Sequence, residues 1–266
     1  MAAAVWGATR RARRYRVGVL AAGLGAMLAA PTPARAQEVG YTASLFAARS
    51  TYPTDRFTSI YLFNSVDMTA GPVRASVSLP FIRQRVTTFD AAVDPVTGNV
   101  TDLDTTTTGL GDPLVRADLR LVDDRSRGLQ VAVAGSVKLP VVDADDGLGT
   151  GVADYGIGGS LFKAAGRTSL YADVLFWKYG DPEGIDFEDS LSYSVGMGRV
   201  LGSGRWSAMV SLAGFSQGIG DAAPPVQLNV AVLALAGRRQ SVAVTAGIGL
   251  TEGSGFSIGT SWRIGS

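Results

Sequence analysis

Apolar and polar residues alternate with a period of two in the segment 109–163, and this pattern most restricts how the chain can fold. From residue 115 to 121, the apolar residues Val115, Ala117, Leu119 and Leu121 alternate with Arg116, Asp118 and Arg120. A period of two puts successive side chains on opposite faces of a β-strand. After a polar turn the alternation resumes from Leu129 to Lys138. The segment therefore predicts an antiparallel hairpin with one apolar and one polar face.

The same unit recurs along the chain. We expect twelve strands, at about residues 39–48, 58–68, 73–86, 115–121, 129–138, 154–163, 169–179, 190–200, 206–217, 226–235, 241–250 and 255–264. Short turns alternate with long loops at 90–108, 141–152, 180–188 and 218–225. This asymmetry is typical of membrane barrels, with the short turns in the periplasm, and a soluble barrel would not need it. An even number of strands also closes the sheet without an edge in hydrocarbon.

The sequence thus predicts an all-β fold, a transmembrane antiparallel up-and-down β-barrel of about twelve strands. Both termini are expected on the short-turn side. Within the third strand, Pro80 cannot donate a ladder hydrogen bond, so we expect a bulge or a register shift there.

The first 36 residues have the features of a secretory signal peptide. A basic region with Arg10, Arg11, Arg13, Arg14 and Arg16 precedes the apolar run 17–30, and Ala34-Arg35-Ala36 supplies small residues before a cleavage point. The run is shorter than the ~20 residues of a spanning helix. We therefore expect residues 1–36 to be a cleaved signal peptide, residues 37–266 to form the barrel, and the protein to be exported to the bacterial outer membrane.

Charge and composition exclude several classes of function. The predicted leader holds six of the 24 Lys and Arg residues and no acids, so the mature chain carries a net charge of −5. It therefore lacks the basic footprint of a nucleic-acid-binding protein. There is no His and no Cys, which removes Ser-His catalysis, thiol chemistry and most zinc sites. We expect no enzymatic activity, no cofactor and no metal site.

The acidic loops are best explained as solvated surface. The segment 143–147 lacks the spacing and the terminal Glu of a calcium-binding loop. Calcium bridging between these loops and lipopolysaccharide remains an open alternative.

Several short motifs also resemble a known family. They are the Gly109-Leu110-Gly111-Asp112-Pro113 opening, the strand end Val137–Pro140, the acidic loop, and the run 147–151 followed by Asp154. Together they resemble the outer-membrane family labelled as the MetA pathway of phenol degradation. The resemblance implies a barrel transporter connected with the breakdown of aromatic compounds. It implies no catalytic residues.

Strand parity assigns side chains to the two faces of the expected barrel. Tyr41, Trp206 and Trp262 fall at short-turn ends on the outward face, where amphipathic rings favour the membrane interface, so they are expected to form a periplasmic aromatic girdle. The candidate pore-lining residues are Arg116, Asp118, Arg120, Lys138, Tyr171, Asp173, Trp177 and Ser192. A lumen with charges and aromatic rings suits a partly apolar solute. Alternatively, these groups pair and plug the bore, as in many small barrels.

These observations predict an outer-membrane channel for the passive uptake of small aromatic or hydrophobic solutes. A closed structural or surface-binding barrel without transport is the alternative. The expected partners are membrane lipid, lipopolysaccharide, the outer-membrane assembly machinery and a small-molecule solute, with no nucleic acid. If Arg116, Arg120 and Lys138 form a positive patch, the bore prefers anions. If Asp118 and Asp173 neutralise the arginines, these residues instead stiffen the wall.

Overall fold

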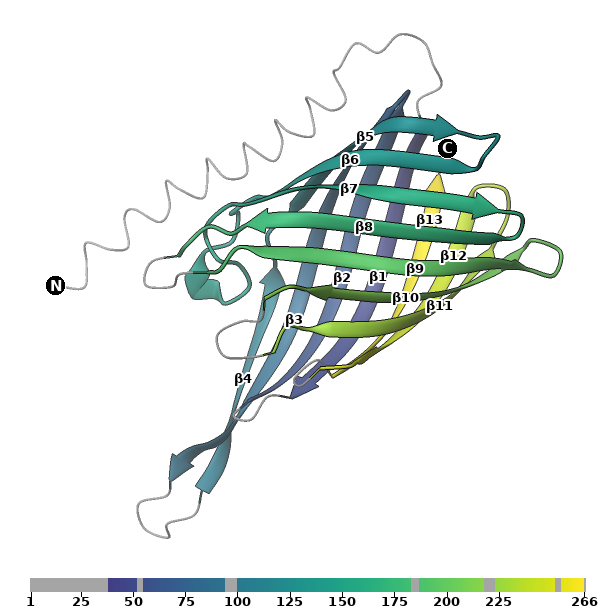
Figure 1. The fold of residues 1–266 in the computed structure, drawn as a ribbon. Coiled ribbons are helices and arrows are strands. Elements are labelled where there is room, and N and C mark those ends of the chain that lie inside the picture. Colours follow the sequence, from purple (N-terminus) through teal and green to yellow (C-terminus); the bar gives the residue numbers. More distant parts are fainter. Residues whose placement is uncertain are drawn as a thin grey trace.

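The computed structural model describes residues 38–51, 55–93, 100–182, 187–217, 223–251 and 255–265. In this range the chain forms one closed antiparallel sheet (Figure 1). Its strands are β1 (Glu38–Thr51), β2 (Asp55–Ala70), β3 (Val73–Val93), β4 (Val100–Leu110), β5 (Leu114–Asp124), β6 (Leu129–Lys138), β7 (Asp154–Ala165), β8 (Thr168–Lys178), β9 (Ser190–Leu201), β10 (Trp206–Phe215), β11 (Val226–Leu235), β12 (Gln240–Gly249) and β13 (Phe256–Gly265). The expected signal peptide lies outside the described residues.

The sheet closes where the first and last strands meet. β1 pairs antiparallel with β13, from Gly40 opposite Gly265 to Arg49 opposite Phe256. Each strand from β5 to β12 pairs with the next strand in the sequence, as in an up-and-down barrel. All backbone groups of a closed sheet can be satisfied within it, which a bilayer core requires. The predicted transmembrane barrel is confirmed.

Thirteen strand segments fill twelve positions in this barrel, because β4 and β5 share one. The first part of β3 pairs with β5, from Val73 to Ser78, and the rest pairs with β4 from Phe81 onward. Residues 111–113 interrupt the shared position, and Gly111 N donates to Pro80 O (2.9 Å). The expectation for Pro80 was wrong: the register between β2 and β3 is continuous, with Phe63 opposite Pro80. The interruption lies instead in the neighbouring strand position, between β4 and β5.

The expectation of a long loop over 90–108 was also wrong. β3 continues to Val93 and β4 begins at Val100, so most of this segment is a hairpin that extends past the rest of the barrel (Figure 1). A run of four threonines, 105–108, lies in β4. The segment has no apolar face because its outward residues beyond Phe81, such as Arg83 and Arg85, are polar.

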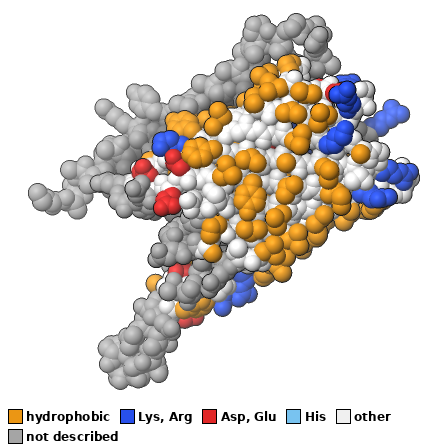
Figure 2. Space-filling model, in the orientation of Figure 1, with side chains coloured by type: hydrophobic (Ala, Val, Ile, Leu, Met, Phe, Trp, Pro, Cys, Tyr) orange, Lys and Arg blue, Asp and Glu red, His pale blue; other side chains and the backbone are white. Residues whose placement is uncertain are grey.

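The outward face carries a wide apolar belt (Figure 2). On β6, Val133 is 44% exposed while its neighbour Ala134 is 4% exposed, so Val133 points outward and Ala134 into the barrel. The same alternation places Val195 and Met197 of β9 outward. Apolar side chains that face outward all round a closed sheet are those of a barrel in lipid. No helix in the described part of the chain is long and apolar enough to cross a membrane.

Candidate functional site

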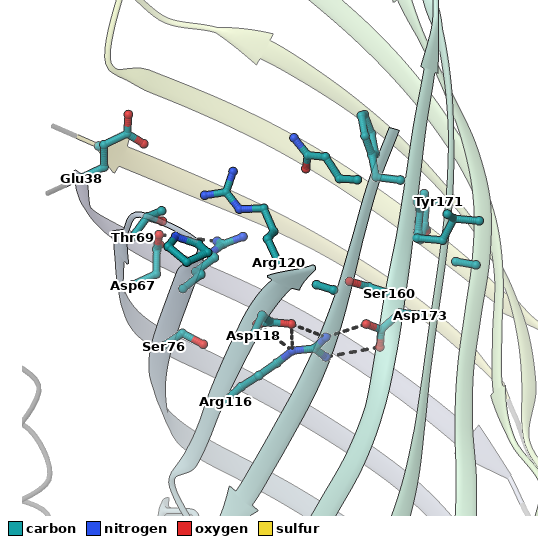
Figure 3. A pocket seen from close by; sticks show the side chains of 18 of the residues that line it. Glu38, Asp67, Thr69, Ser76, Arg116, Asp118, Arg120, Ser160, Tyr171 and Asp173 are labelled. Carbon is teal, nitrogen blue, oxygen red and sulfur yellow. Dashed lines mark hydrogen bonds and ion pairs between the residues drawn. The ribbon is translucent and has the colours of Figure 1, made fainter. Parts of the chain in front are cut away.

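A cavity of about 780 Å³ occupies the barrel interior at the short-turn end. Its walls come from β1, β2, β3, β5, β6, β7, β8 and β13, and its polar side chains include Asp67, Arg116, Asp118, Arg120 and Asp173 (Figure 3). Strand pairing brings these residues into one enclosed space, although the first and last of them, Asp67 and Asp173, lie more than 100 residues apart in the sequence.

Arg116 bridges two distant strands across this cavity. Its Nη2 lies 2.9 Å from Asp118 Oδ1 on its own strand, β5, and 2.6 Å from Asp173 Oδ2 on β8, while Nη1 donates to Asp173 Oδ1 at 3.3 Å (Figure 3). β6 and β7 lie between those two strands. At ~4.8 Å per strand, the wall path between them is roughly 14 Å. The guanidinium therefore crosses part of the lumen, and its bidentate bond to Asp173 fixes it there.

A second ion pair lies beside the start of β1 and the end of β13. Arg263 of β13 donates to both carboxylate oxygens of Asp67 on β2, at 2.9 Å for Nη2 to Oδ2, and Arg74 lies 3.5 Å from the same carboxylate. This pair spans β1, and it passes directly over Gly40. A Cβ at residue 40 would collide with the guanidinium and with Asp67 Oδ1, which explains glycine at this position.

The residues of the family-like motifs meet in a third cluster. Lys138 Nζ lies 2.6 Å from Asp154 Oδ2 and 3.9 Å from Asp112 Oδ2, and it donates to Thr150 Oγ1 at 2.6 Å. Asp112 in turn accepts backbone N–H bonds from Val141 and Val142, both at 2.9 Å, and from Thr150 at 3.3 Å. The cluster thus fastens the connection between β6 and β7 to the interruption between β4 and β5.

Large aromatic side chains lie flat against the inner wall. Trp177 covers Gly156, where a Cβ would come within 3.1 Å of the indole, and its Nε1 donates to Ser192 Oγ at 2.9 Å. Tyr171 covers Gly196 in the same way. On the opposite wall three rings form a row: Phe46 and Phe63 meet edge to face at 6.1 Å, and Phe63 stacks on Tyr61 at 5.8 Å. Small inward residues thus make room for large ones instead of leaving an empty bore.

The predicted lining residues fall into two groups. Arg116, Asp118, Arg120, Tyr171 and Asp173 line the cavity. Lys138, Trp177 and Ser192 face the interior nearer the long-loop end, outside the cavity lining.

One of the two expectations for the lumen was a positive patch of Arg116, Arg120 and Lys138. The described residues do not form such a patch. Arg116 and Lys138 each contact two carboxylates, and Arg120 Nη1 pairs with Asp123 Oδ2 at 2.9 Å. The alternative, a network that neutralises the arginines, agrees with these contacts.

The sequence reasoning missed the roles of Asp112, Thr150 and Asp154, and of the Asp67–Arg263 pair. The motif around Asp112 was visible as a resemblance, but no spacing rule links its segments. The alternation of strand faces puts both Asp67 and Arg263 on the inward face, and this was the only feature of the sequence that pointed to their pairing.

The three girdle candidates lie on the outward face at the short-turn end. The rings of Tyr41 and Trp262 meet edge to face at 6.4 Å, and the Tyr41 hydroxyl donates to Asn64 Oδ1 at 2.7 Å. Trp262 Nε1 donates to Gln240 Oε1 at 3.2 Å. Trp206 begins β10 and is 55% exposed. The side-chain oxygens of Asn64 and Gln240 thus accept hydrogen bonds from aromatic donors on the outer wall.

A smaller cavity of about 410 Å³ lies toward the long-loop end, lined by β1, β2 and β3 residues that include Phe57, Ser59, Tyr61 and Gln84. Among the residues that the structure describes, no group of three or more acidic side chains is arranged to hold a metal ion. The interior therefore presents ion pairs, hydroxyls and aromatic rings.

A closed twelve-stranded sheet with an apolar outer belt and a polar interior defines a transmembrane β-barrel of the outer-membrane type. The chain belongs to the family described as "Putative MetA-pathway of phenol degradation", whose model matches residues 38–263.

Among solved structures, an outer membrane channel from Pseudomonas putida F1 superposes with a TM-score of 0.65 at 13% identity, covering 89% of this chain and 97% of that one. This likeness shows the fold. The transport unit of the autotransporter AIDA-I from Escherichia coli gives a TM-score of 0.49 at 8% identity, over 86% of this chain and 89% of that one. At that score nothing further follows for this chain. Among curated proteins, none matches the sequence.

Proposed function

We propose that this protein is a channel of the bacterial outer membrane that passes small aromatic or hydrophobic solutes passively. The observation that carries the proposal is the cavity of about 780 Å³ inside a closed barrel whose outer surface suits lipid. The proposal assigns the chain no catalytic step. It includes export by a signal peptide, folding by the outer-membrane assembly machinery, and contact with lipopolysaccharide.

The inner wall supports an aromatic solute. Phe46, Tyr61 and Phe63 form a continuous row of rings, and Tyr171 and Trp177 lie on the other side of the interior. Aromatic rings attract one another in offset or edge-to-face contacts, worth ~0.5–1.5 kcal/mol beyond area burial. Weak contacts repeated along a path let a solute enter and leave, which conduction requires. The family description, which names phenol degradation, agrees with this solute class.

The charges support a neutral solute, with a small preference for cations over anions. The described lining of the large cavity is balanced, with the carboxylates of Glu38, Asp67, Asp118 and Asp173 and the guanidinium groups of Arg74, Arg116, Arg120 and Arg263. Nearer the long-loop end, the Lys138 cluster contains two carboxylates for one ammonium, so it has one negative charge in excess when both carboxylates are ionised. An enclosed lumen focuses such a field on passing ions.

One observation favours the alternative of a closed structural barrel. The Arg116–Asp173 bond crosses part of the lumen, and the inward residues Ser136, Leu175 and Ser190 are each only 3% exposed. A solute can therefore pass the Arg116–Asp173 ion pair only if the Arg116 side chain moves or if a path lies beside it.

Liposome swelling with matched solutes tests the proposal. Phenyl glucoside and cyclohexyl glucoside have nearly equal size and the same polar group, and the sugar keeps both from crossing lipid unaided. Liposomes that contain the barrel should swell faster in phenyl glucoside. Equal rates would contradict the aromatic preference, and no swelling in either solute would establish the closed alternative.

A further inference from the structure

The outer rim at the short-turn end carries a set of arginines for which the described residues offer no carboxylate partner. They come from four turns or adjacent strand ends: Arg125, Arg167, Arg199, Arg205, Arg238 and Arg239. All six are exposed, and within the described part of the chain none forms an ion pair with a carboxylate. Figure 2 shows most of the basic side chains of this face gathered at this end, whereas at the other end acidic side chains lie beside a few basic ones.

Two of these arginines flank a ring of the outer wall. Arg199 lies on the outward face of β9, opposite Thr168 on one side and Ala208 on the other. Toward the middle of the barrel the next outward residues are Met197 and Leu170, both about half exposed. Arg205 immediately precedes Trp206, which pairs with Leu201 at the strand end. The cations therefore lie at the border of the apolar belt, level with an aromatic ring.

That border is where lipid headgroups lie. Trp and Tyr favour the interface, and a long arginine side chain extends its charge toward the headgroups while its methylenes stay on apolar surface. The guanidinium fork matches the geometry of a phosphate and binds it in a bidentate manner. Each Lys or Arg near an anionic surface strengthens the attraction by a factor of about five.

The long-loop end carries charges of both signs. Its described connections carry Asp143, Asp146, Asp181 and Glu188, which repel anionic headgroups and offset the exposed Arg49 and Arg83. The charge difference between the two ends therefore distinguishes one leaflet from the other.

We infer that the arginine rim is a binding surface for anionic glycerophospholipids, whose phosphate groups contact Arg199 and Arg205 beside Trp206. The inference rests on the membrane placement of the proposed function, but it does not depend on transport. It assigns the rim a selective lipid contact that anchors the barrel at a fixed depth and favours one orientation.

Trp206 serves as the reporter in the test. The barrel is reconstituted in phosphatidylcholine vesicles that contain either dibrominated phosphatidylcholine or dibrominated phosphatidylglycerol, because bromine quenches indole fluorescence on contact. The signal of Trp206 is the difference between the protein and its Trp206→Phe variant. We expect phosphatidylglycerol to bind at this site at least about fivefold more strongly than phosphatidylcholine, and this ratio is the lipid preference. High salt should reduce this preference.

Two double variants that each remove two positive charges distinguish the effect of the arginine rim from the effect of the protein's net charge. Arg199→Gln with Arg205→Gln should bring the ratio close to one. Arg49→Gln with Arg83→Gln removes two exposed, outward-facing arginines at the long-loop end and should leave the ratio unchanged. If the first double variant does not fold, Arg238→Gln with Arg239→Gln, with Trp262 as reporter, replaces it.

A ratio near one in the unsubstituted protein would overturn the inference, as would a preference that survives loss of Arg199 and Arg205 or that falls equally in the control. Swelling measured in the same vesicles keeps the two proposals apart. A barrel that conducts without a lipid preference refutes only the rim. A barrel that neither lipid quenches refutes the membrane placement as well.

Discussion

The carboxylate of Asp112 joins three backbone segments and is nearly buried. Replacing it by Ala leaves the N–H groups of Val141, Val142 and Thr150 without this acceptor, and an unsatisfied buried donor costs ~1–3 kcal/mol. We therefore expect Asp112→Ala to lower the free energy of unfolding by about 2–4 kcal/mol, measured by urea unfolding in detergent. The matched control is Asp146→Ala in the connection between β6 and β7 that Asp112 fastens, where the side chain is exposed. Equal effects from both changes would contradict the anchoring role.

Asp104 makes a pH-dependent contact in the hairpin of β3 and β4, beyond the apolar belt. Hydrogen bonds from Arg85 and from Thr87 lower the pKa of Asp104 from 3.8 to about 2. Because the folded pKa is depressed, the stabilising contact is complete above about pH 4 and is lost as the pH falls through 2. A ¹³C NMR titration of the carboxylate should have its midpoint near pH 2, and Arg85→Gln should raise it. An unchanged midpoint in that variant would show that the ion pair does not form.

At the scale of the strand, parity determines which substitutions damage the barrel. Val133→Arg puts a charge on the lipid face of β6 and should cost ~2–4 kcal/mol near the bilayer midplane. Ser160→Arg puts the same side chain into the cavity, opposite Asp173 on the neighbouring strand, and should cost much less. Heat-modifiable mobility on gels reports folding of both variants. If Ser160→Arg were as damaging as Val133→Arg, the assignment of the two faces would be wrong.

Strand positions were predictable because alternation is local. β6 and β11 have the expected bounds, and the other predicted strands differ by a few residues at their ends, except β3, which extends further. β4 was missed because the hairpin beyond Phe81 has polar residues on its outward face, so no apolar period marks it. Hydrophobic periodicity reports burial or lipid contact, and an exposed hairpin has neither.

The ion pairs were less predictable than the faces. Parity correctly put Arg116, Asp118 and Asp173 inside, but it contains no information on which strands curve close enough to pair. Lys138 was expected to contribute a free charge to the lumen. It instead contacts Asp112 and Asp154, which belong to segments whose proximity depends on the interrupted position between β4 and β5. Such contacts follow from tertiary geometry, which local patterns do not encode.

For the whole molecule, the orientation in the membrane is a separate prediction. The hairpin of β3 and β4 is expected outside the cell, and the turn between β9 and β10 in the periplasm. A protease site inserted between Val93 and Val100 should be cut on intact cells, whereas one at Gly202-Ser203 should be protected until the outer membrane is permeabilised. The reverse pattern would refute this orientation, and the lipid contact of the arginine rim would then face the outer leaflet.

The central claim, that this barrel conducts, is tested most directly by single-channel recording in planar bilayers. We predict discrete conductance steps with a mild cation preference, because the charges of the described cavity lining balance and the Lys138 cluster adds one excess carboxylate. Arg116→Ala should enlarge the steps, since it removes a side chain that crosses part of the lumen. A reversal potential in a salt gradient measures the preference. If neither the unsubstituted protein nor Arg116→Ala gives any steps after confirmed insertion, the lumen is closed and the channel account is wrong.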